Sequence, residues 1–496
     1  MTDRSNGTFR MTPRLVASVF LLLMLAVTAL EAGADSVFPL HTAANGRYLQ
    51  DRNGAPFLMI GDSPHSLIVS LDTADEAAYL TNRANHGFNS LWIELLCDSY
   101  TGGQGTEAPP GLRERLRAWL KNTSVGQANY GHDTNGNNPF TRTLDGRYYD
   151  LTTPNQVYWS HVDWLARTAA TNGLQCVFTP LDQGGWMKTA LANGTDGCRQ
   201  YGRFLGDRYK DYSNIFWNMG NDFQNWSTAT NDAVILAIAD GIKSVDAHHP
   251  MTIELDYMVS DSLADPNWAR EVSVNGIYTY YMPYTESLLG YNRPNHGPCL
   301  FLEGNYEFEN NNRVQPPGPL VLRLQEYWSL LSGCLAGHMY GNHYTWVITS
   351  DWKSHLDTPG AAQLRYFKNF FTNVRWFDLV PDQSHRLVTS GYGTFNTNTD
   401  FVLTANDYVT AAQSPDGTLG VVYCPKKATL TLCLTNFAGP VTAKWFDPTS
   451  GTYTPVAGQP FANTNVAKNL ATPGNNSAAD PDWVLLLETS SSSRLR

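Results

Sequence analysis

The stretch "NIFWNMGNDF" at residues 214–223 ends an apolar run with an amide and a carboxylate, Asn221 and Asp222. The run itself has the composition of a short buried strand. A strand that ends in this way either runs out into solvent or delivers an acid to a functional site. The organisation of the neighbouring sequence distinguishes between these two interpretations.

Apolar runs with polar ends recur along the first two thirds of the chain. They predict eight strands, at residues 57–63, 90–98, 174–182, 214–222, 251–256, 274–281, 299–307 and 337–344. Helical patterns lie between most of them, for example at 74–87, 159–173, 197–213 and 322–333. Near-continuously apolar strands that alternate with helices are typical of parallel strands buried on both faces. The sequence therefore predicts an α/β fold, a (β/α)8 TIM barrel, over residues 35–385.

Two regions depart from this alternation. An Asn-, Gly- and aromatic-rich insertion that includes residues 130–150 follows the second predicted strand, so it either shapes the substrate site or forms a surface loop. After residue 385 short strand patterns replace the helices, at 407–414, 419–425, 428–436, 441–447, 451–458 and 482–488. They predict a small antiparallel β-sandwich domain over residues 386–490.

The N-terminus predicts export. Arg4, Arg10 and Arg14 precede the apolar run at 15–30, and Ala32 and Ala34 then match a cleavage pattern. We therefore expect a signal peptide over residues 1–34, cut after Ala34, with a secreted or periplasmic mature protein and no membrane span after cleavage.

Charge and cysteine content exclude some classes of protein. The net charge is −11, and it becomes −12 when residues 1–34 leave with three Arg, one Asp and one Glu. An acidic exported protein without a basic cluster is a poor candidate for nucleic-acid binding. The seven Cys show no C-x-x-C spacing, and only Cys424 and Cys433 flank a possible hairpin where they could form a disulfide.

Carboxylates dominate the predicted strand ends, where a TIM barrel carries its catalytic groups. The ionisable residues at these ends are Asp62, His65, Glu94, Asp98, Asp182, Asp222, Glu254, Asp256, Glu303, Glu307, His338 and His343. Hydrolysis of a glycosidic bond needs two carboxyl groups, one as acid and one as nucleophile or base. A carbohydrate substrate also suits the 14 Trp and 25 Tyr, since sugar rings stack on aromatic rings.

Asp222 and Glu303 are the preferred catalytic pair. They end the fourth and seventh predicted strands, which lie on opposite sides of an eight-stranded barrel mouth. Glu254 is the main rival for a catalytic role, and a supporting, hydrogen-bonding role is its alternative. The candidate substrate-binding residues are Asn221, Asp62, His65, Trp92, Glu94, Asp182, Trp186, Glu254, Tyr280, Tyr306, His338, Tyr340 and Trp346.

Other chemistries fit less well. The chain has no G-x-S-x-G, H-E-x-x-H or P-loop motif, and "GGQG" at 102–105 does not continue as a dinucleotide fingerprint. We expect neither a metal nor an organic cofactor, although His338 and His343 are residue types that can bind metal.

The residues that carry these inferences resemble a known family, the apiosidase-like glycoside hydrolases. The matching stretches include 38–63, 87–92, "WNMGND", "FLEGNYE", 323–343 and 363–383. The C-terminal part, with "WFDPTSGTYTPV" at 445–456, is similar to the module named for a collagen-binding domain of a collagenase. The first strand end departs from the expected pattern, because "GDSPHS" places His65 where an aromatic residue is common.

The resemblance implies a retaining mechanism by double displacement. Asp222 corresponds to the acid/base, Glu303 to the nucleophile and Asn221 to the residue that binds the sugar 2-hydroxyl. It also implies plant cell-wall side chains as substrates, with apiose as a candidate released sugar. The alternative is a non-catalytic carbohydrate- or protein-binding protein on a barrel scaffold. A collagen-degrading peptidase is a third interpretation, and it fits poorly because the chain has no zinc motif and no nucleophile triad.

Overall fold

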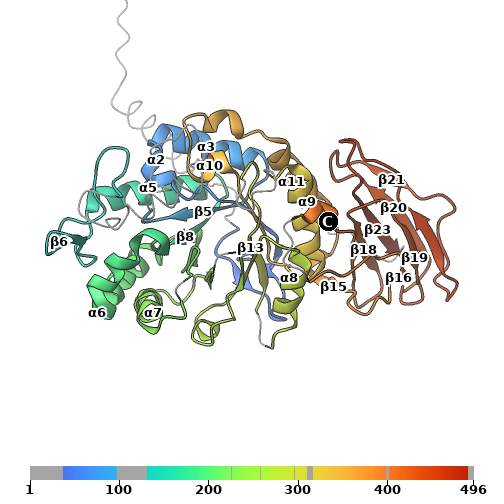
Figure 1. The fold of residues 1–496 in the computed structure, drawn as a ribbon, viewed down its shortest axis with the longest axis horizontal. Coiled ribbons are helices and arrows are strands. Elements are labelled where there is room, and N and C mark those ends of the chain that lie inside the picture. Colours follow the sequence, from blue (N-terminus) through green and yellow to red (C-terminus); the bar gives the residue numbers. More distant parts are fainter. Residues whose placement is uncertain are drawn as a thin grey trace, which may run out of the picture. The chain divides into compact units, whose positions relative to one another are not determined.

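Eight parallel strands form the wall of a barrel in the computed structural model, which describes residues 37–97, 131–224, 226–256, 258–294, 297–309, 317–397 and 402–489 (Figure 1). They are β4 (Met59–Asp62), β5 (Ser90–Glu94), β8 (Gln175–Thr179), β9 (Ile215–Asn218), β10 (Met251–Thr252), β12 (Asn275–Thr279), β13 (Cys299–Glu303) and β14 (Gly337–Tyr340). Each lies within one of the eight predicted strands. The prediction of a TIM-like barrel is therefore confirmed.

A ninth strand completes the sheet. β11 (Val259–Asp261) pairs antiparallel with β12, and the sheet order runs from β10 at one end to β11 at the other. Ser262, directly after β11, links these two ends. Its Oγ donates to the carbonyl of Ile253 at 2.6 Å and accepts the N–H of Gly276 at 2.8 Å. The side chain of Ser262 thus links the residue after β10 to β12 at the seam where the barrel closes.

Helices cover the outside of the sheet (Figure 1). The longer ones are α3 (Thr73–Asn85), α5 (Gln156–Thr171), α6 (Gln183–Tyr209), α7 (Ala229–Lys243), α8 (Pro283–Asn292), α9 (Pro319–Leu331) and α11 (Pro359–Thr372). Side-chain caps begin several of them: Asp182, for example, accepts from the N–H groups of Gly184 and Gly185. The predicted helix at 197–213 is part of the longer α6, in which Gly194 at φ 63° marks a kink. No helix in the described ranges is long and apolar enough to cross a bilayer.

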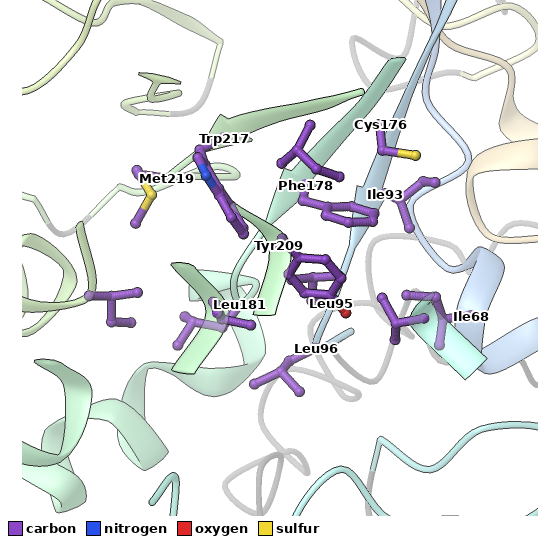
Figure 2. Close-up of a cluster of buried hydrophobic side chains, with 14 of the residues drawn as sticks. Ile68, Ile93, Leu95, Leu96, Cys176, Phe178, Leu181, Tyr209, Trp217 and Met219 are labelled. Atoms are coloured by element: carbon purple, nitrogen blue, oxygen red, sulfur yellow. The ribbon is translucent and has the colours of Figure 1, made fainter. Parts of the chain in front are cut away.

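Strand side chains alternate between the barrel interior and the layer under the helices. Trp92, Val177 and Phe216 point inward and belong to one buried cluster. Their neighbours point outward against the helices, as Figure 2 shows for Ile93, Cys176, Phe178 and Trp217 together with Tyr209 of α6. This two-residue period decides which strand residues can reach the mouth of the barrel.

The C-terminal strands form two antiparallel sheets. The first contains β15 (Val380–Pro381), β17 (Thr410–Gln413), β18 (Leu419–Cys424), β23 (Trp483–Thr489), β20 (Val441–Phe446) and β21 (Tyr453–Pro455), and the second contains β16 (Val388–Ser390), β19 (Thr429–Leu432) and β22 (Lys468–Ala471). Buried side chains from both sheets share one core, so the predicted sandwich is confirmed. The predicted pairing of Cys424 with Cys433 is wrong, because both thiols are free. β18 and β19 lie in different sheets and do not form the expected hairpin.

A buried ion pair joins the barrel to the sandwich, and both belong to one compact unit, Phe38–Arg496. Arg323 of α9 donates through Nε and Nη2 to both carboxylate oxygens of Asp482, at 2.9 and 2.8 Å. Its Nη2 also donates to Asp480 at 2.7 Å. Since Arg323 and Asp482 are both inaccessible to solvent, the loss of one partner leaves an uncompensated charge in the interior.

Replacement of Arg323 with Leu is therefore expected to lower the free energy of unfolding by about 3–5 kcal/mol. Urea denaturation measures this change. The matched control is Arg199→Leu, whose ion pair with Asp240 is about half exposed and contributes at most about 1 kcal/mol. Equal midpoints for Arg323→Leu and the wild type would show that the buried pair does not hold the two domains together.

Candidate active site

Asp222 lies at the mouth of the barrel, four residues after β9 ends at Asn218. Its Oδ1 accepts a hydrogen bond from the hydroxyl of Tyr278 on β12 at 3.1 Å. Its backbone N–H donates to Oε2 of Glu254 at 3.2 Å. The residue keeps partial exposure to solvent, and its φ of 47° lies in the left-handed region. The carboxyl group thus has a defined position and an opening toward a ligand.

Glu303 reaches the same mouth through an irregularity in β13. The parallel register passes from Ile277–Phe301 directly to Tyr278–Glu303, so β13 contributes one extra residue. Such a bulge changes the face on which the next side chain lies. Without it Glu303 would follow Cys299 and Phe301 into the outer layer. With it the carboxylate accepts from two tyrosine hydroxyls, Tyr280 at Oε1 (2.9 Å) and Tyr306 at Oε2 (3.0 Å).

Asn221, Glu94 and His65 form a polar group beside this pair. Nδ2 of Asn221 donates to Oε1 of Glu94 at 2.5 Å and lies 3.2 Å from Nδ1 of His65. Burial lowers the pKa of His65 to about 3, so its ring is neutral near pH 7. Nδ1 of His65 then accepts from Asn221, and Nε2–H points to the Tyr306 hydroxyl at 3.4 Å. Asn221 is thereby held with its amide oxygen available as an acceptor.

Aromatic rings surround His65. Its ring centroid is 4.5 Å from that of Trp92, 6.0 Å from that of Trp346 and 6.3 Å from that of Tyr306. His65 therefore lies within an aromatic wall even though an aromatic residue was expected at its own position. Trp92 itself is fully buried and donates through Nε1 to Thr179 at 2.7 Å, so it supports the floor of the site.

The environment of the site raises the pKa values of its carboxyl groups. Burial raises the pKa of Asp222 to about 7, against the hydrogen bond from Tyr278, and the charges of Asp182 and Glu309 add to the increase. Burial also raises the pKa of Glu303 and of Glu254 well above the usual range, and neighbouring carboxylates add to both. The hydrogen bonds from Tyr280 and Tyr306 act in the opposite direction on Glu303. Two tyrosine hydroxyls therefore favour the anion of Glu303 against the effect of burial, whereas one tyrosine hydroxyl donates to Asp222.

Three predicted binding residues lie on the outward face of their strands. Asp62 accepts from Nε of Arg83 at 2.6 Å under helix α3. The His338 ring is stacked on Phe301, and the Tyr340 hydroxyl donates to Glu307 at 2.6 Å. The inward residues of β4 and β14 are Gly61 and Met339 instead. The structure thus places Asp62, His338 and Tyr340 in the layer between sheet and helices, away from Asp222 and Glu303.

The other predicted residues have structural contacts of their own. Trp186 is buried against Tyr149, with ring centroids 5.8 Å apart, and Asp182 caps α6. Asp256 accepts from Nε1 of Trp226 at 2.9 Å. Asp98 lies outside the described residues, as does most of the insertion before residue 131. Among the residues that are described, no group of three or more His, Cys, Asp or Glu could hold a metal ion.

Sequence reasoning missed Tyr278, Gln183 and Glu309. Gln183, the first residue of α6, binds the segment after β9: its side chain accepts from the N–H of Asn221 at 2.7 Å and donates to the carbonyl of Met219 at 2.7 Å. Tyr278 could have been found, because it lies two residues before Tyr280 within the predicted strand 274–281, where the two-residue period gives both side chains the same face. Nothing in the residue type of Gln183 or Glu309 pointed to the site.

The hydroxyl of Tyr278 is expected to control the pH profile. Its hydrogen bond lowers the pKa of Asp222, so Tyr278→Phe should raise that pKa and move the basic limb of kcat/KM to higher pH by about half to one unit. In the matched control, Tyr280→Phe removes a hydrogen bond that lowers the pKa of Glu303 and should move the acidic limb upward instead. A basic limb that stays in place in Tyr278→Phe would contradict the role of Asp222 as acid.

A parallel barrel with two carboxyl groups at its mouth fits the class of the glycoside hydrolases, whose reaction needs two such groups. The chain belongs to the apiosidase-like family within this class: the profile described as "Apiosidase-like, catalytic domain" matches residues 43–378. The profile described as "Putative collagen-binding domain of a collagenase" matches residues 397–488. No curated protein matches the chain.

Solved structures share the fold over most of the chain. One described as "Glycoside hydrolase" is 21% identical with a TM-score of 0.68, over 92% of this chain and 98% of the other. A glycoside hydrolase family 5 protein from Bacteroides vulgatus ATCC 8482 is 18% identical with a TM-score of 0.70, over 92% and 95%. At these identities the likeness establishes the common architecture of barrel and sandwich.

Proposed function

We propose that the protein is a retaining glycoside hydrolase in which Asp222 is the acid/base and Glu303 is the nucleophile. The observation that carries this proposal is the different environment of the two carboxyls. Asp222 has a pKa of about 7, where a group can both donate and accept a proton. Glu303 accepts a tyrosine hydroxyl at each oxygen, which stabilises its anion.

The reaction would proceed in two displacements. The carboxylic proton of Asp222 passes to the glycosidic oxygen while the bond from that oxygen to the anomeric carbon breaks, and an oxygen of Glu303 bonds to the carbon. The alcohol leaves, and Asp222 is now an anion. It takes a proton from a water molecule whose oxygen attacks the anomeric carbon, and the bond to Glu303 breaks. Both carboxyls return to their starting states.

Glu254 fits the nucleophile's role less well than Glu303. One of its oxygens accepts from the Asp222 N–H, and the other has no hydrogen-bond partner in the described part of the chain. An anion at this position would be poorly stabilised, because it is buried beside Glu303 and Asp222. The environment therefore favours Glu254 as a neutral group and Glu303 as the anion.

The proposed substrates are side chains of plant cell-wall polysaccharides, with apiose as the released sugar. This specificity rests on the apiosidase-like family, and the polar group of Asn221, Glu94 and His65 is suited to bind sugar hydroxyls. The charged and apolar N-terminal pattern supports action outside the cytoplasm after cleavage at Ala34.

A screen of released monosaccharides from pectic and other wall glycans tests this function. The wild type should release a reducing sugar from at least one glycan, and apiose is the expected product. Glu303→Gln should release none above background. Release of a different sugar would overturn the substrate assignment, and equal release by Glu303→Gln would overturn the mechanism.

A further inference from the structure

The segment after β10 contacts the main chain that carries Asp222. We propose that Glu254 is a positioning residue, which holds the backbone of Asp222 in its left-handed conformation and so directs the aspartate side chain into the site. This inference rests on the proposed role of Asp222 as acid/base. It assigns to Glu254 a function separate from substrate binding and from either chemical step.

The contact between the two segments is close. A Cβ on Gly220 would lie 2.4 Å from the carbonyl oxygen of Glu254, so only glycine allows this approach. Phe223 forms a parallel bridge with Leu255 directly beyond it. The Asp222 N–H lies between these contacts and donates to Glu254 Oε2 at 3.2 Å. The side chain of Glu254 thus accepts the hydrogen bond of the Asp222 N–H at the turn that follows β9.

The conformation of Asp222 explains why such a group is needed. Aspartate adopts the left-handed region more readily than most residues, but φ of 47° still costs free energy that the surroundings must offset. Aspartate is also one methylene shorter than glutamate, so its carboxyl can reach a glycosidic oxygen only from a suitably turned backbone. The hydroxyl of Tyr278 fixes the far end of the side chain, and Glu254 fixes its origin.

A neutral Glu254 suits this role. The titratable groups that face it are Glu303 from β13, Asp222 from the end of β9 and Glu94 from β5. All three disfavour a further negative charge, and Glu254 is only 1% exposed. A protonated carboxyl still accepts the Asp222 N–H through its carbonyl oxygen, here Oε2, while the proton resides on Oε1. It therefore holds the turn without opposing the anion of Glu303.

Two substitutions separate positioning from proton transfer. Glu254→Gln keeps an acceptor for the Asp222 N–H, whereas Glu254→Leu removes it. Aryl apiosides with leaving groups of different acidity are the probes, since a strongly acidic phenol leaves without help from an acid. Glu326→Gln is the matched control, because Glu326 is also a buried carboxyl but lies on α9 outside the site.

We expect Glu254→Gln and Glu326→Gln to keep kcat within about threefold of the wild type. Glu254→Leu should lose about 30-fold or more in kcat/KM, which reports the first displacement, with a weakly acidic leaving group and less than about threefold in kcat/KM with dinitrophenol. A loss of the same size with every leaving group, or no loss, overturns the proposal. A loss in Glu254→Gln as large as in Glu254→Leu also overturns it, because it would show that Glu254 itself transfers a proton.

Crystal structures of the two variants supply a readout that needs no substrate. The φ of Asp222 should stay positive in Glu254→Gln and leave the left-handed region in Glu254→Leu. An unchanged φ in Glu254→Leu overturns the positioning role. The activity of Asp222→Asn distinguishes failure of the proposed function from failure of the positioning role of Glu254. If that variant is fully active the proposed function fails, and if it is inactive while Glu254→Leu is wild-type, only the positioning inference fails.

Discussion

Glu303→Gln is expected to lower kcat by about 10⁴-fold or more on any glycoside that the wild type hydrolyses. The amide has nearly the shape of the carboxylate, but it cannot form the bond to the anomeric carbon. The oxygen of Gln can still accept one tyrosine hydroxyl, so KM should change little. Steady-state kinetics on a chromogenic glycoside measure both constants.

The matched control for this prediction is Glu254→Gln, the same substitution in a neighbouring buried carboxyl. It should keep kcat within about threefold of the wild type, since Glu254 does not touch the reacting atoms in this account. A reversed pattern, with Glu303→Gln active and Glu254→Gln inactive, would transfer the nucleophile's role to Glu254. Equal melting temperatures of the variants would exclude a loss of folding as the cause.

Asp222→Ala is expected to lower kcat by about 10²–10⁴-fold on natural glycosides, the range for loss of a general acid. The loss should shrink with dinitrophenyl glycosides, because their first displacement needs no proton. The second displacement still lacks its base, so the glycosyl-enzyme should accumulate and appear as a burst of dinitrophenol. Stopped-flow absorbance records the burst.

External azide should then restore turnover of Asp222→Ala, because this anion attacks the anomeric carbon without a general base. The product would be a glycosyl azide with the configuration of the substrate. Wild-type enzyme is the control and should show no activation by azide. A deficit in Asp222→Ala that is independent of the leaving group and insensitive to azide would contradict the acid/base assignment.

The barrel was predictable because its physical signal is repeated. Eight apolar runs that alternate with helices leave few alternatives, and every one contains a strand. The end of "NIFWNMGNDF" was predictable for the same reason, since strand ends meet at one face of the barrel. The face of the strand on which an individual side chain lies was harder to predict. His338 and Tyr340 occur at a strand end but point outward. The two-residue period of a β-strand places them on the outer face once Met339 is known to point inward.

Glu303 shows the opposite case. Strict alternation along β13 would place it with Phe301 in the outer layer, and only the bulge brings it to the mouth. Glu303 was predicted from its place at the end of the seventh strand and from the family resemblance, although strict alternation would have rejected it. The contacts of Gln183 and Glu254 with the Asn221–Asp222 backbone depend on the three-dimensional turn after β9, for which the sequence has no signal apart from Gly220.

The most direct test of the central claim is to trap the covalent intermediate. A 2-deoxy-2-fluoro glycoside of the released sugar should label the wild-type enzyme at one carboxylate, and peptide mass spectrometry identifies the residue. We expect one label per chain, on the Glu303 peptide, with no label in Glu303→Gln. A stable label on Glu254 or on any other residue, or turnover without any covalent species, would contradict it.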